Sequence, residues 1–359
     1  MSPYVLALPP SFDVPLSWGP RSAAELVGAS PKTLRRALNS KRAAAATYVE
    51  LWKEANTADS SNLLARAFRS DDRTNFLSWD DFEWALGAAS TRQNAVPLRR
   101  DHSQDTGTTA RLALVPAWDM CNHDPRGPSS SVVTSSSSSS SGNDDDDDDE
   151  PRLELVAEEA YASGAEVRMC YGTRSTLEFA VYNGFLVKGE RASSDAVDID
   201  VQFPSTSPSK ALASNLLRKA GLPTTNAGSS GVFFRGALVV VAQDTARGDV
   251  GPDDALRAVG LAAVVDKPRL AHLMRSGQAF PEWRPLDDRH SADAADFLRR
   301  VCDAELARRV ATNAIVRLTF SREGDDGSSP EDDSRRDLAR ALLHFEFDFL
   351  RAASKSLAL

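Results

Sequence analysis

The sequence is poor in the residues that build metal centres and disulfide frameworks. Its 359 residues include only three cysteines and five histidines, and none of them forms a Cys-x-x-Cys or His-x-x-x-His pair. Structural zinc sites need ligands at such short spacings, and disulfide-stabilised secreted folds need many paired cysteines. The sequence therefore predicts no bound metal, and it predicts that Cys121, Cys170 and Cys302 are reduced thiols of an intracellular protein.

Long apolar runs are also missing. No segment approaches the roughly 20 apolar residues that cross a bilayer, and residues 1–10 have neither the basic start nor the apolar core of a secretory signal. Acidic residues outnumber basic ones by 51 to 42, which disfavours general nucleic-acid binding. We expect a monomer without membrane or nucleic-acid partners, located in the cytoplasm, with the nucleus as an alternative.

One segment lacks the apolar residues that folding requires. Residues 128–150 are dominated by serine up to Ser141 and then contain unbroken aspartate from Asp144 to Asp149. Such a composition is typical of disorder. Because the entropic cost of closing a loop grows only slowly with its length, the segment can be accommodated between folded parts. We expect a disordered loop at residues 128–150.

The first half of the chain combines helical and strand patterns. Ser22 to about Gly87 has a helical pattern, within which Ser78-Trp-Asp-Asp81 resembles a capping box. Leu112 to Val115 is a short apolar run closed by a proline, which predicts a buried strand. Two further strands are predicted at Arg152–Val156 and Val167–Tyr171.

The second half is expected to be mainly helical. Ser175-Thr-Leu-Glu178 is a second capping box, and its helix should end at Gly184, a residue suited to a left-handed terminus. From about residue 200 onward, segments with interspersed arginine and leucine predict helices, including Lys210–Ala220 and Ser334–Ala353. A loop is expected around Glu323–Asp333.

Two polar clusters follow two of the apolar segments. The run Leu112-Ala-Leu-Val-Pro-Ala-Trp-Asp-Met-Cys-Asn-His123 ends in hydrogen-bonding side chains, and Cys170-Tyr-Gly-Thr-Arg-Ser175 follows the later strand. They can form one site only if the fold brings the two ends together. Taken singly, Asn122 and His123 are also consistent with a satisfied core pair, and Tyr171 with a core tyrosine at the end of a strand.

Taken in order, these motifs resemble the C-terminal half of a SET domain. The similar features are the Asn-His pair, the strand that ends in Tyr-Gly, Arg174-Ser-x-x-Glu-Phe179 and the Gly-Phe pair that starts at Gly184. The match is to the rubisco lysine methyltransferase-like class, which has a helical insertion and a helical C-terminal domain. Thr91–Asn94, Trp118–His123 and Tyr171–Ser175 are similar to the actin-histidine N-methyltransferases of that class.

The resemblance implies an α+β fold class in which a partial SET-domain β fold carries a helical insertion and is followed by a mostly helical substrate-binding domain. The implied domains are residues 1–110 (helical insertion), 111–190 (C-terminal half of the SET domain) and 200–359 (substrate-binding domain). The strand pair with a Gly-x-Gly turn that opens the family's SET domain has no counterpart in this sequence.

The resemblance also implies a cofactor, S-adenosyl-L-methionine, and the residues that would hold it. Methyl transfer from a sulfonium ion is an in-line displacement, in which the enzyme aligns donor and acceptor and excludes water. The cofactor residues implied by similarity are Arg92, Asp119, Met120, Cys121, Asn122, His123, Asn183, Gly184 and Phe185. Tyr171 and Asn94 are the implied catalytic residues, and Asn94, Trp118 and Arg174 would bind the protein substrate. The alternative for Arg174 is an exposed arginine at a helix start.

Asn94 is the residue on which the choice of acceptor depends. Presenting a lysine as a neutral amine at pH 7 costs about 4–5 kcal/mol, because its ordinary pKa is near 10.4. An imidazole is already mostly neutral and needs only the correct tautomer. The Asn94 amide can accept the hydrogen bond of the protonated ring nitrogen and leave the other nitrogen facing the sulfonium. In the alternative interpretation, Asn94 merely ends the helix that begins after Ser78.

We therefore predict an S-adenosylmethionine-dependent protein-histidine N-methyltransferase that acts on actin. A protein-lysine N-methyltransferase of the rubisco or histone type is the enzymatic alternative. The third hypothesis is a catalytically inactive remnant that binds peptides through its helical domain.

Overall fold

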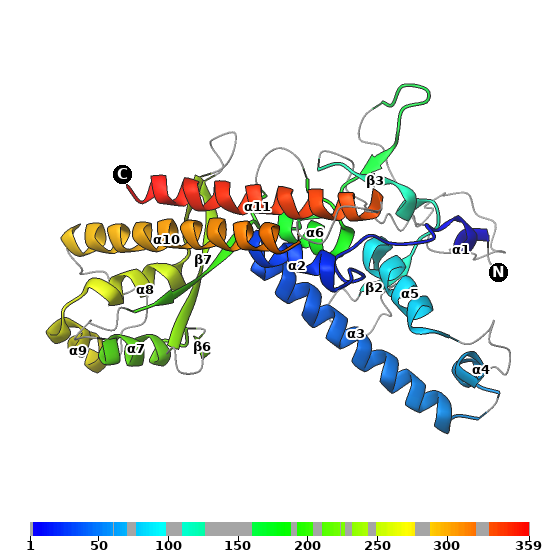
Figure 1. Ribbon diagram of the computed structural model, residues 1–359, viewed down its shortest axis with the longest axis horizontal. Coiled ribbons are helices and arrows are strands. Elements are labelled where there is room, and N and C mark those ends of the chain that lie inside the picture. Colours follow the sequence, from blue (N-terminus) through cyan, green and yellow to red (C-terminus); the bar gives the residue numbers. More distant parts are fainter. Residues whose placement is uncertain are drawn as a thin grey trace, which may run out of the picture. The chain divides into compact units, whose positions relative to one another are not determined.

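The computed structural model describes most of the chain (Figure 1). The described residues are 3–59, 61–69, 77–97, 110–125, 160–187, 192–203, 210–222, 224–226, 232–242, 249–276, 288–320 and 330–358. The predicted disordered loop at 128–150 and the predicted strand Arg152–Val156 lie outside these ranges. Both stay predictions.

The chain divides into two compact units. Unit 1 comprises Met1–Phe12 and Ala44–Thr173, and unit 2 comprises Asp13–Ala43 and Arg174–Leu359. Helix α3 (Pro31–Thr57) contributes residues to both, because the division falls inside it. The predicted domains at 1–110, 111–190 and 200–359 stay predictions.

Three helices of unit 1 pack around a cluster of aromatic rings. They are the second half of α3, α4 (Leu63–Arg69) and α5 (Trp79–Arg92), and the short helix α1 (Pro3–Ala7) also belongs to this unit. The ring of Tyr48 in α3 lies with its centroid 5.5 Å from that of Phe68 in α4, and 5.6 and 5.4 Å from those of Trp79 and Phe82 in α5. Tilted and edge-on aromatic pairs of this kind stabilise a core beyond the area that they bury. They hold α4 and α5 against α3.

Helix α5 begins at the predicted capping box. The backbone N–H of Asp81 donates to Ser78 Oγ at 3.1 Å, and the backbone N–H of Ser78 donates to Asp81 Oδ2 at 3.0 Å. Two N–H groups that an isolated helix would leave unpaired are thereby satisfied. The helix ends at Arg92, and the chain continues directly into a strand.

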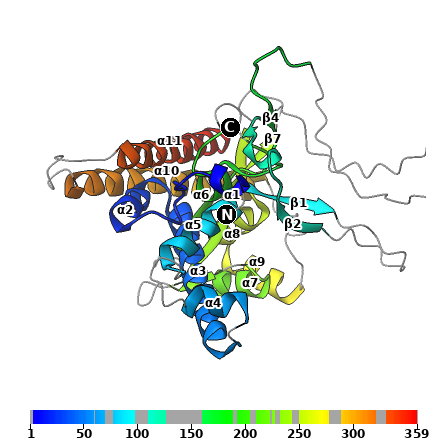
Figure 2. The same ribbon diagram turned by 90° about the vertical axis from the view of Figure 1, so that its right-hand side faces the viewer.

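The strands of unit 1 form two small sheets. β1 (Gln93–Pro97) pairs antiparallel with β2 (Ala110–Leu114), with Gln93 opposite Leu114 (Figure 2). After the short 3₁₀ turn η1 (Trp118–Met120), β3 (Asn122–His123) pairs parallel with β4 (Arg168–Met169). The predicted strand at Val167–Tyr171 is therefore shorter than expected.

The predicted strand at Leu112–Val115 is present as β2, but the prediction that it is buried is wrong. The side chains of Leu112 and Leu114 are 67% and 39% exposed. The reason is the small size of the sheet, since β2 pairs only with β1 among the described strands. An apolar run of this length indicates a strand without showing that both of its faces are covered.

Unit 2 contains a four-stranded antiparallel sheet, although the sequence predicts a mainly helical second half. The strands are β5 (Ala196–Gln202), β6 (Thr224–Asn226), β7 (Val232–Ala242) and β8 (Asp249–Pro252). β7 is central: β5 pairs along one of its edges, and β6 and β8 pair with its two ends on the other. Val197, Ile199 and Val201 of β5 are buried and alternate with aspartates, the period-2 pattern of a half-buried strand.

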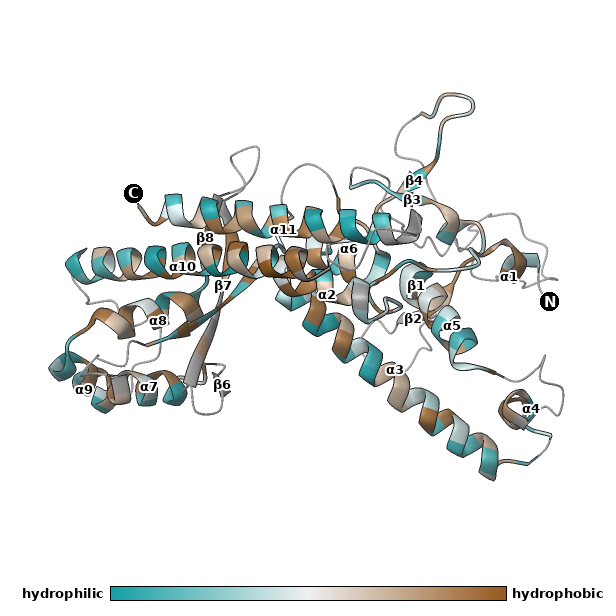
Figure 3. Ribbon diagram, in the orientation of Figure 1, coloured by the Kyte–Doolittle hydropathy of each residue, from teal (hydrophilic) through white to brown (hydrophobic). Residues whose placement is uncertain are grey.

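Helices cover this sheet and enclose the main core of unit 2. They are α7 (Lys210–Lys219), α8 (Asp254–Val264), α9 (Lys267–Ser276), α10 (Asp288–Phe320) and α11 (Pro330–Ser356). Helix α8, which packs on β7, is predominantly apolar along its length (Figure 3). The helix predicted at Lys210–Ala220 is confirmed. Of the helices in the described ranges, none combines the length and the apolar character needed to cross a membrane.

A second core of unit 2 joins α2 (Pro20–Ala29) and α6 (Thr176–Asn183) to α11. Leu26 of α2, Leu177 of α6 and Leu342 of α11 are all fully buried there. The predicted helix at Ser334–Ala353 is confirmed, but it begins earlier, at Pro330. Residues Pro330–Asp333, predicted as loop, form its first turn, where proline is well tolerated.

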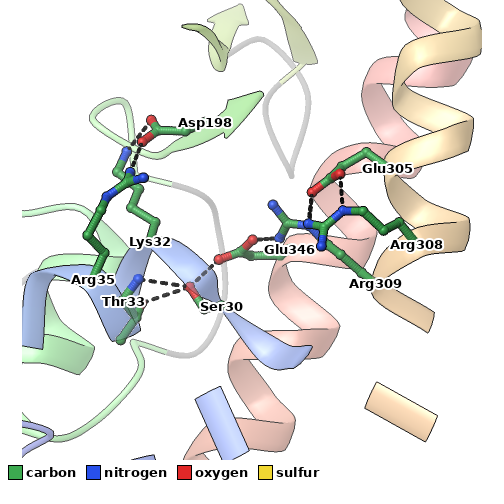
Figure 4. Close-up of polar contacts among 9 residues, drawn as sticks. All are labelled: Ser30, Lys32, Thr33, Arg35, Asp198, Glu305, Arg308, Arg309 and Glu346. Atoms are coloured by element: carbon green, nitrogen blue, oxygen red, sulfur yellow. Dashed lines mark hydrogen bonds and ion pairs between the residues drawn. The ribbon is translucent and has the colours of Figure 1, made fainter. Parts of the chain in front are cut away.

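A buried polar network connects helices of unit 2 (Figure 4). Ser30, between α2 and α3, donates from its hydroxyl to Glu346 of α11, and Glu346 forms an ion pair with Arg309 of α10. Arg309 also contacts Glu305 at 2.8 Å. Burial lowers the pKa of Arg309, and the nearby Glu305 carboxylate opposes that effect. At the N-terminal end of α3, Lys32 Nζ lies 2.8 Å from Asp198 Oδ1 on β5.

Candidate functional site

Strand pairing in unit 1 brings the two predicted motifs together. In the parallel β3–β4 pair, Asn122 lies opposite Arg168 and His123 opposite Met169. The backbone N–H of Asp124 donates to the Met169 carbonyl at 3.0 Å, which continues the pairing. Because both strands run in the same direction, the residues that follow them meet at the same edge. His123 and Tyr171 are therefore neighbours, as the sequence predicts.

Tyr171 is bound to the first motif at two points. Its backbone N–H donates to His123 Nδ1 at 3.2 Å, and its hydroxyl donates to the Cys121 carbonyl at 2.7 Å. The two rings lie with centroids 5.1 Å apart at an angle of 40°. A ring nitrogen that accepts a hydrogen bond carries no proton, so a neutral His123 has its proton on Nε2. The phenol and the imidazole are thus fixed relative to each other.

Arg92 joins the end of α5 to the same motif. Its Nη1 donates to the Asp119 carbonyl at 2.7 Å and lies 3.4 Å from the Met120 sulfur. The guanidinium also lies over the Phe12 ring, 5.8 Å from the centroid, at a distance typical of a cation–π contact. The C-terminal residue of α5 therefore holds the turn η1 in place.

Asn94 lies on β1 and not in the helix, whose last residue is Arg92. Its amide nitrogen donates to the Arg92 carbonyl at 3.0 Å. The side chain thus binds a carbonyl at the end of α5, which agrees with the alternative interpretation that Asn94 ends this helix. The same bond fixes the orientation of the amide. The amide oxygen remains the group with acceptor capacity, which is the atom that the predicted catalytic role needs.

In the described part of the chain, the turn η1 and the last residue of α5 contain buried polar atoms that lack hydrogen-bond partners. Within the described residues, no hydrogen bond reaches Arg92 Nε, Trp118 Nε1 or Asp119 Oδ1. The side chains of Trp118 and Asp119 are only 8% and 6% exposed. Buried polar groups are nearly always paired in folded proteins, so these two donors and this acceptor are candidate contacts for a bound polar group.

The backbone leading into η1 is also strained. Ala117 has φ of 70°, the only positive value for a residue other than glycine in the described parts of the chain. Such conformations cost free energy in a residue with a Cβ, and they are concentrated at functional sites. The strained turn directs Trp118 and Asp119 inward.

The other residues of the motif have different surroundings. Asn122 is exposed, and its amide nitrogen donates to Glu166 Oε1 at 2.5 Å. That bond, together with the bond from Arg168, lowers the pKa of Glu166. Burial raises the pKa of the Cys121 thiol, and the Asp119 and Glu166 carboxylates add to the effect. Cys121 is therefore a thiol at neutral pH and not a nucleophilic thiolate.

The remaining predicted site residues belong to unit 2. Arg174 precedes the predicted capping box of α6, which is confirmed, and its Nη1 donates to Asn183 Oδ1 at 2.9 Å. Gly184 ends α6 with φ of 77°, as predicted, and a Cβ there would lie 2.2 Å from the Asp13 carbonyl oxygen. Phe185 packs on Phe179 with ring centroids 5.4 Å apart. Their roles in binding cofactor or substrate stay predictions.

One residue near this motif was missed at the level of sequence. The hydroxyl of Tyr4 in α1 donates to Asp119 Oδ2, although the two residues are 115 positions apart. No motif or spacing around Tyr4 signals this contact.

Groups of three or more potential metal ligands are absent from the described part of the chain.

The fold resembles solved structures of LSMT, among them that of its SET domain. The structure of rubisco LSMT bound to AdoMet matches with a TM-score of 0.53 and 17% identity over 99% of this chain and 69% of that one. The SET domain of LSMT bound to MeLysine and AdoHcy matches with a TM-score of 0.52 and 17% identity, over 99% and 70% of the two chains. The chain thus has the fold of this SET-domain class, and the predicted fold class is confirmed.

The sequence itself is similar to actin-histidine N-methyltransferases. Over 224 residues, 62% of this chain, the identity is 29% with the enzyme of Xenopus tropicalis and 28% with those of Danio rerio and Homo sapiens. The chain spans about a third of the length of these curated relatives. No family model matches the sequence.

Proposed function

We propose that this protein is an S-adenosylmethionine-dependent protein-histidine N-methyltransferase whose acceptor is a histidine of actin. The observation that carries the proposal is the junction of β3 and β4, where the Tyr171 ring lies 5.1 Å from that of His123 and its hydroxyl donates to Cys121. Similarity to actin-histidine N-methyltransferases over 224 residues supports it. The protein is proposed to act as a monomer in the cytoplasm, a location that its three free thiols support.

The residues around η1 fit the amino-acid end of this cofactor. That end is a zwitterion, and its carboxylate and ammonium groups would complement the unpaired donors Arg92 Nε and Trp118 Nε1 and the unpaired acceptor Asp119 Oδ1. Charged partners make the strongest hydrogen bonds in buried surroundings. When bound, the cofactor supplies a methyl group on a sulfonium ion.

Tyr171 and Asn94 would orient the acceptor imidazole. The Tyr171 hydroxyl proton points to the Cys121 carbonyl, so the phenol presents oxygen lone pairs and not a proton to the reaction. The Asn94 amide, oriented by its bond to the Arg92 carbonyl, would accept the N–H of the acceptor ring. The other ring nitrogen then keeps its lone pair for attack on the methyl group.

Product analysis tests this proposal. Purified protein is incubated with actin and methyl-labelled S-adenosylmethionine, and the labelled actin is hydrolysed to amino acids. We expect label in methylhistidine. Label found only in methyllysine, or no label above that of a heat-denatured sample, would contradict the proposed activity.

A protein-lysine N-methyltransferase is the second candidate, because the solved structures with this fold include LSMT bound to MeLysine. The same hydrolysate separates the two, and the pH dependence gives an independent distinction. A lysine acceptor must lose a proton whose pKa is near 10.4, so the rate should rise steeply above pH 8. A histidine acceptor is mostly neutral above about pH 6.5, so its rate should be nearly constant there.

A further inference from the structure

Asp119 is held by a residue that lies far from it in the sequence. The Tyr4 hydroxyl donates to Asp119 Oδ2, whereas Oδ1 of the same carboxylate is buried and has no partner among the described residues. Arg92 binds the backbone carbonyl of Asp119 and not its carboxylate. The Tyr4 hydroxyl is therefore the side-chain donor that sets the direction of the carboxylate.

The segment that carries Tyr4 is itself fixed to α5. Trp84 Nε1 donates to the Pro9 carbonyl at 2.9 Å, and the ring of Phe12 lies 6.1 Å from that of Trp84. Phe12 also lies close to Gly87 in α5, where an added Cβ would be only 2.9 Å from Phe12 Cβ. These contacts and the Tyr4–Asp119 bond all lie within unit 1. Tyr4 reaches Asp119 from a segment anchored on the same helix that carries Arg92.

The protonation state of Tyr4 suits a permanent donor. Burial raises its pKa to about 12, and the hydrogen bond to Asp119 adds to the effect. The phenol therefore keeps its proton throughout the physiological pH range. With Oδ2 held by this hydroxyl, the Oδ1 atom of the Asp119 carboxylate is oriented to accept a hydrogen bond from a cation. An ammonium group beside a buried carboxylate forms a strong, directional hydrogen bond.

We propose that Tyr4 is a positioning residue for the cofactor: it holds the Asp119 carboxylate so that Oδ1 accepts a hydrogen bond from the ammonium of the amino-acid moiety. This inference rests on the proposed function, because it assumes a sulfonium cofactor with that moiety. Tyr4 itself does not touch the cofactor. Its effect should therefore be confined to ligands that carry the amino-acid end.

Two ligands that differ in that end test the inference by calorimetric titration. S-adenosylhomocysteine carries the amino acid, and methylthioadenosine has the same nucleoside and sulfur without it. For Tyr4→Phe we expect the Kd of S-adenosylhomocysteine to rise about tenfold, as for the loss of a hydrogen bond to a charged group. The Kd of methylthioadenosine should stay within about twofold of the wild-type value. Tyr161→Phe is the matched control, because Tyr161 is a half-buried tyrosine of the same unit and lies outside the motifs of the candidate site.

The outcomes separate this inference from the proposed function. Wild-type protein that binds neither ligand would overturn both. Two results would overturn the positioning role alone, provided that the wild type binds S-adenosylhomocysteine. In the first, Tyr4→Phe binds S-adenosylhomocysteine as tightly as the wild type does. In the second, Tyr4→Phe raises the Kd of both ligands by the same factor. If Tyr4→Phe does not fold, as judged by near-ultraviolet circular dichroism, Asp119→Asn replaces it. That variant should weaken only S-adenosylhomocysteine, and an equal loss for both ligands would again overturn the role.

Discussion

Tyr171 and Arg92 each direct a donor to a backbone carbonyl of one short segment. Tyr171 reaches the Cys121 carbonyl and Arg92 the Asp119 carbonyl, two residues apart. The strained Ala117 turn just before them is held in place by these bonds. At the scale of single residues, the candidate site is therefore a strained turn held by the last residue of α5 and by a residue that follows β4.

Removal of the Tyr171 hydroxyl tests this clamp. Tyr171→Phe keeps the ring beside His123 and deletes the bond to Cys121. We expect methyl transfer to fall about 10²-fold, because small displacements of an aligned acceptor have effects of that size. The rate at saturating cofactor and actin checks it, with Tyr161→Phe expected to match wild type. A wild-type rate for Tyr171→Phe would remove Tyr171 from the mechanism.

At the scale of elements, the sequence predicts those features that depend only on residues close together in the chain. Both capping boxes, at Ser78 and Ser175, and the glycine terminus of α6 are present as predicted. The meeting of β3 and β4 was predicted only through the order of the motifs. The alternating residues of β5 indicate a strand locally, but the pairing of β5–β8 into a sheet and the exposure of Leu112 could not be read from local patterns, because both depend on which strands pair across long separations.

Tyr4 shows the same limit for the candidate site. Its partner Asp119 lies in a motif that the sequence identifies. The hydrogen bond between them depends on how the segment that follows α1 packs against α5. Only tertiary packing places it there.

The capping box of α5 gives a pH-dependent prediction. The bonds from Ser78 lower the pKa of Asp81 in the folded protein. The carboxylate therefore stabilises the fold above its unfolded pKa of about 3.9, and this contribution is lost as pH falls through the lower, folded value. Asp81→Ala should reduce the free energy of unfolding at pH 7 by roughly 0.5–1 kcal/mol, with the lower end favoured by solvent exposure.

Urea unfolding at pH 7 and below pH 3 measures this difference. The difference in free energy of unfolding between wild type and Asp81→Ala should be smaller below pH 3 than at pH 7. Asp80→Ala is the control, since Asp80 lies in the same first turn without a capping bond and should lose only the smaller helix-dipole term. An equal gap at both pH values would show that the carboxylate does not act through the cap.

At the scale of the whole molecule, the two units differ in how they are held together. The described part of unit 1 relies on an aromatic cluster and two small sheets, whereas unit 2 has two apolar cores and a buried charge network. Glu346 is 1% exposed, and it links α11 to Arg309 of α10 and to Ser30 beside α2. A buried charge of this kind is tolerated only while its partners remain.

Breaking this network should destabilise unit 2 more than replacing it. Arg309→Met leaves the Glu346 carboxylate buried without its counter-ion, and we expect a loss of about 3–5 kcal/mol in the free energy of unfolding. Adding Glu346→Leu should restore much of that loss, because the unpaired charge is gone and the site becomes apolar. Urea unfolding of the single and double variants measures both steps, and Arg340→Met on the exposed side of α11 is the control. A double variant as unstable as Arg309→Met would mean that Ser30, and not the ion pair, is the partner on which the packing of α2, α10 and α11 depends.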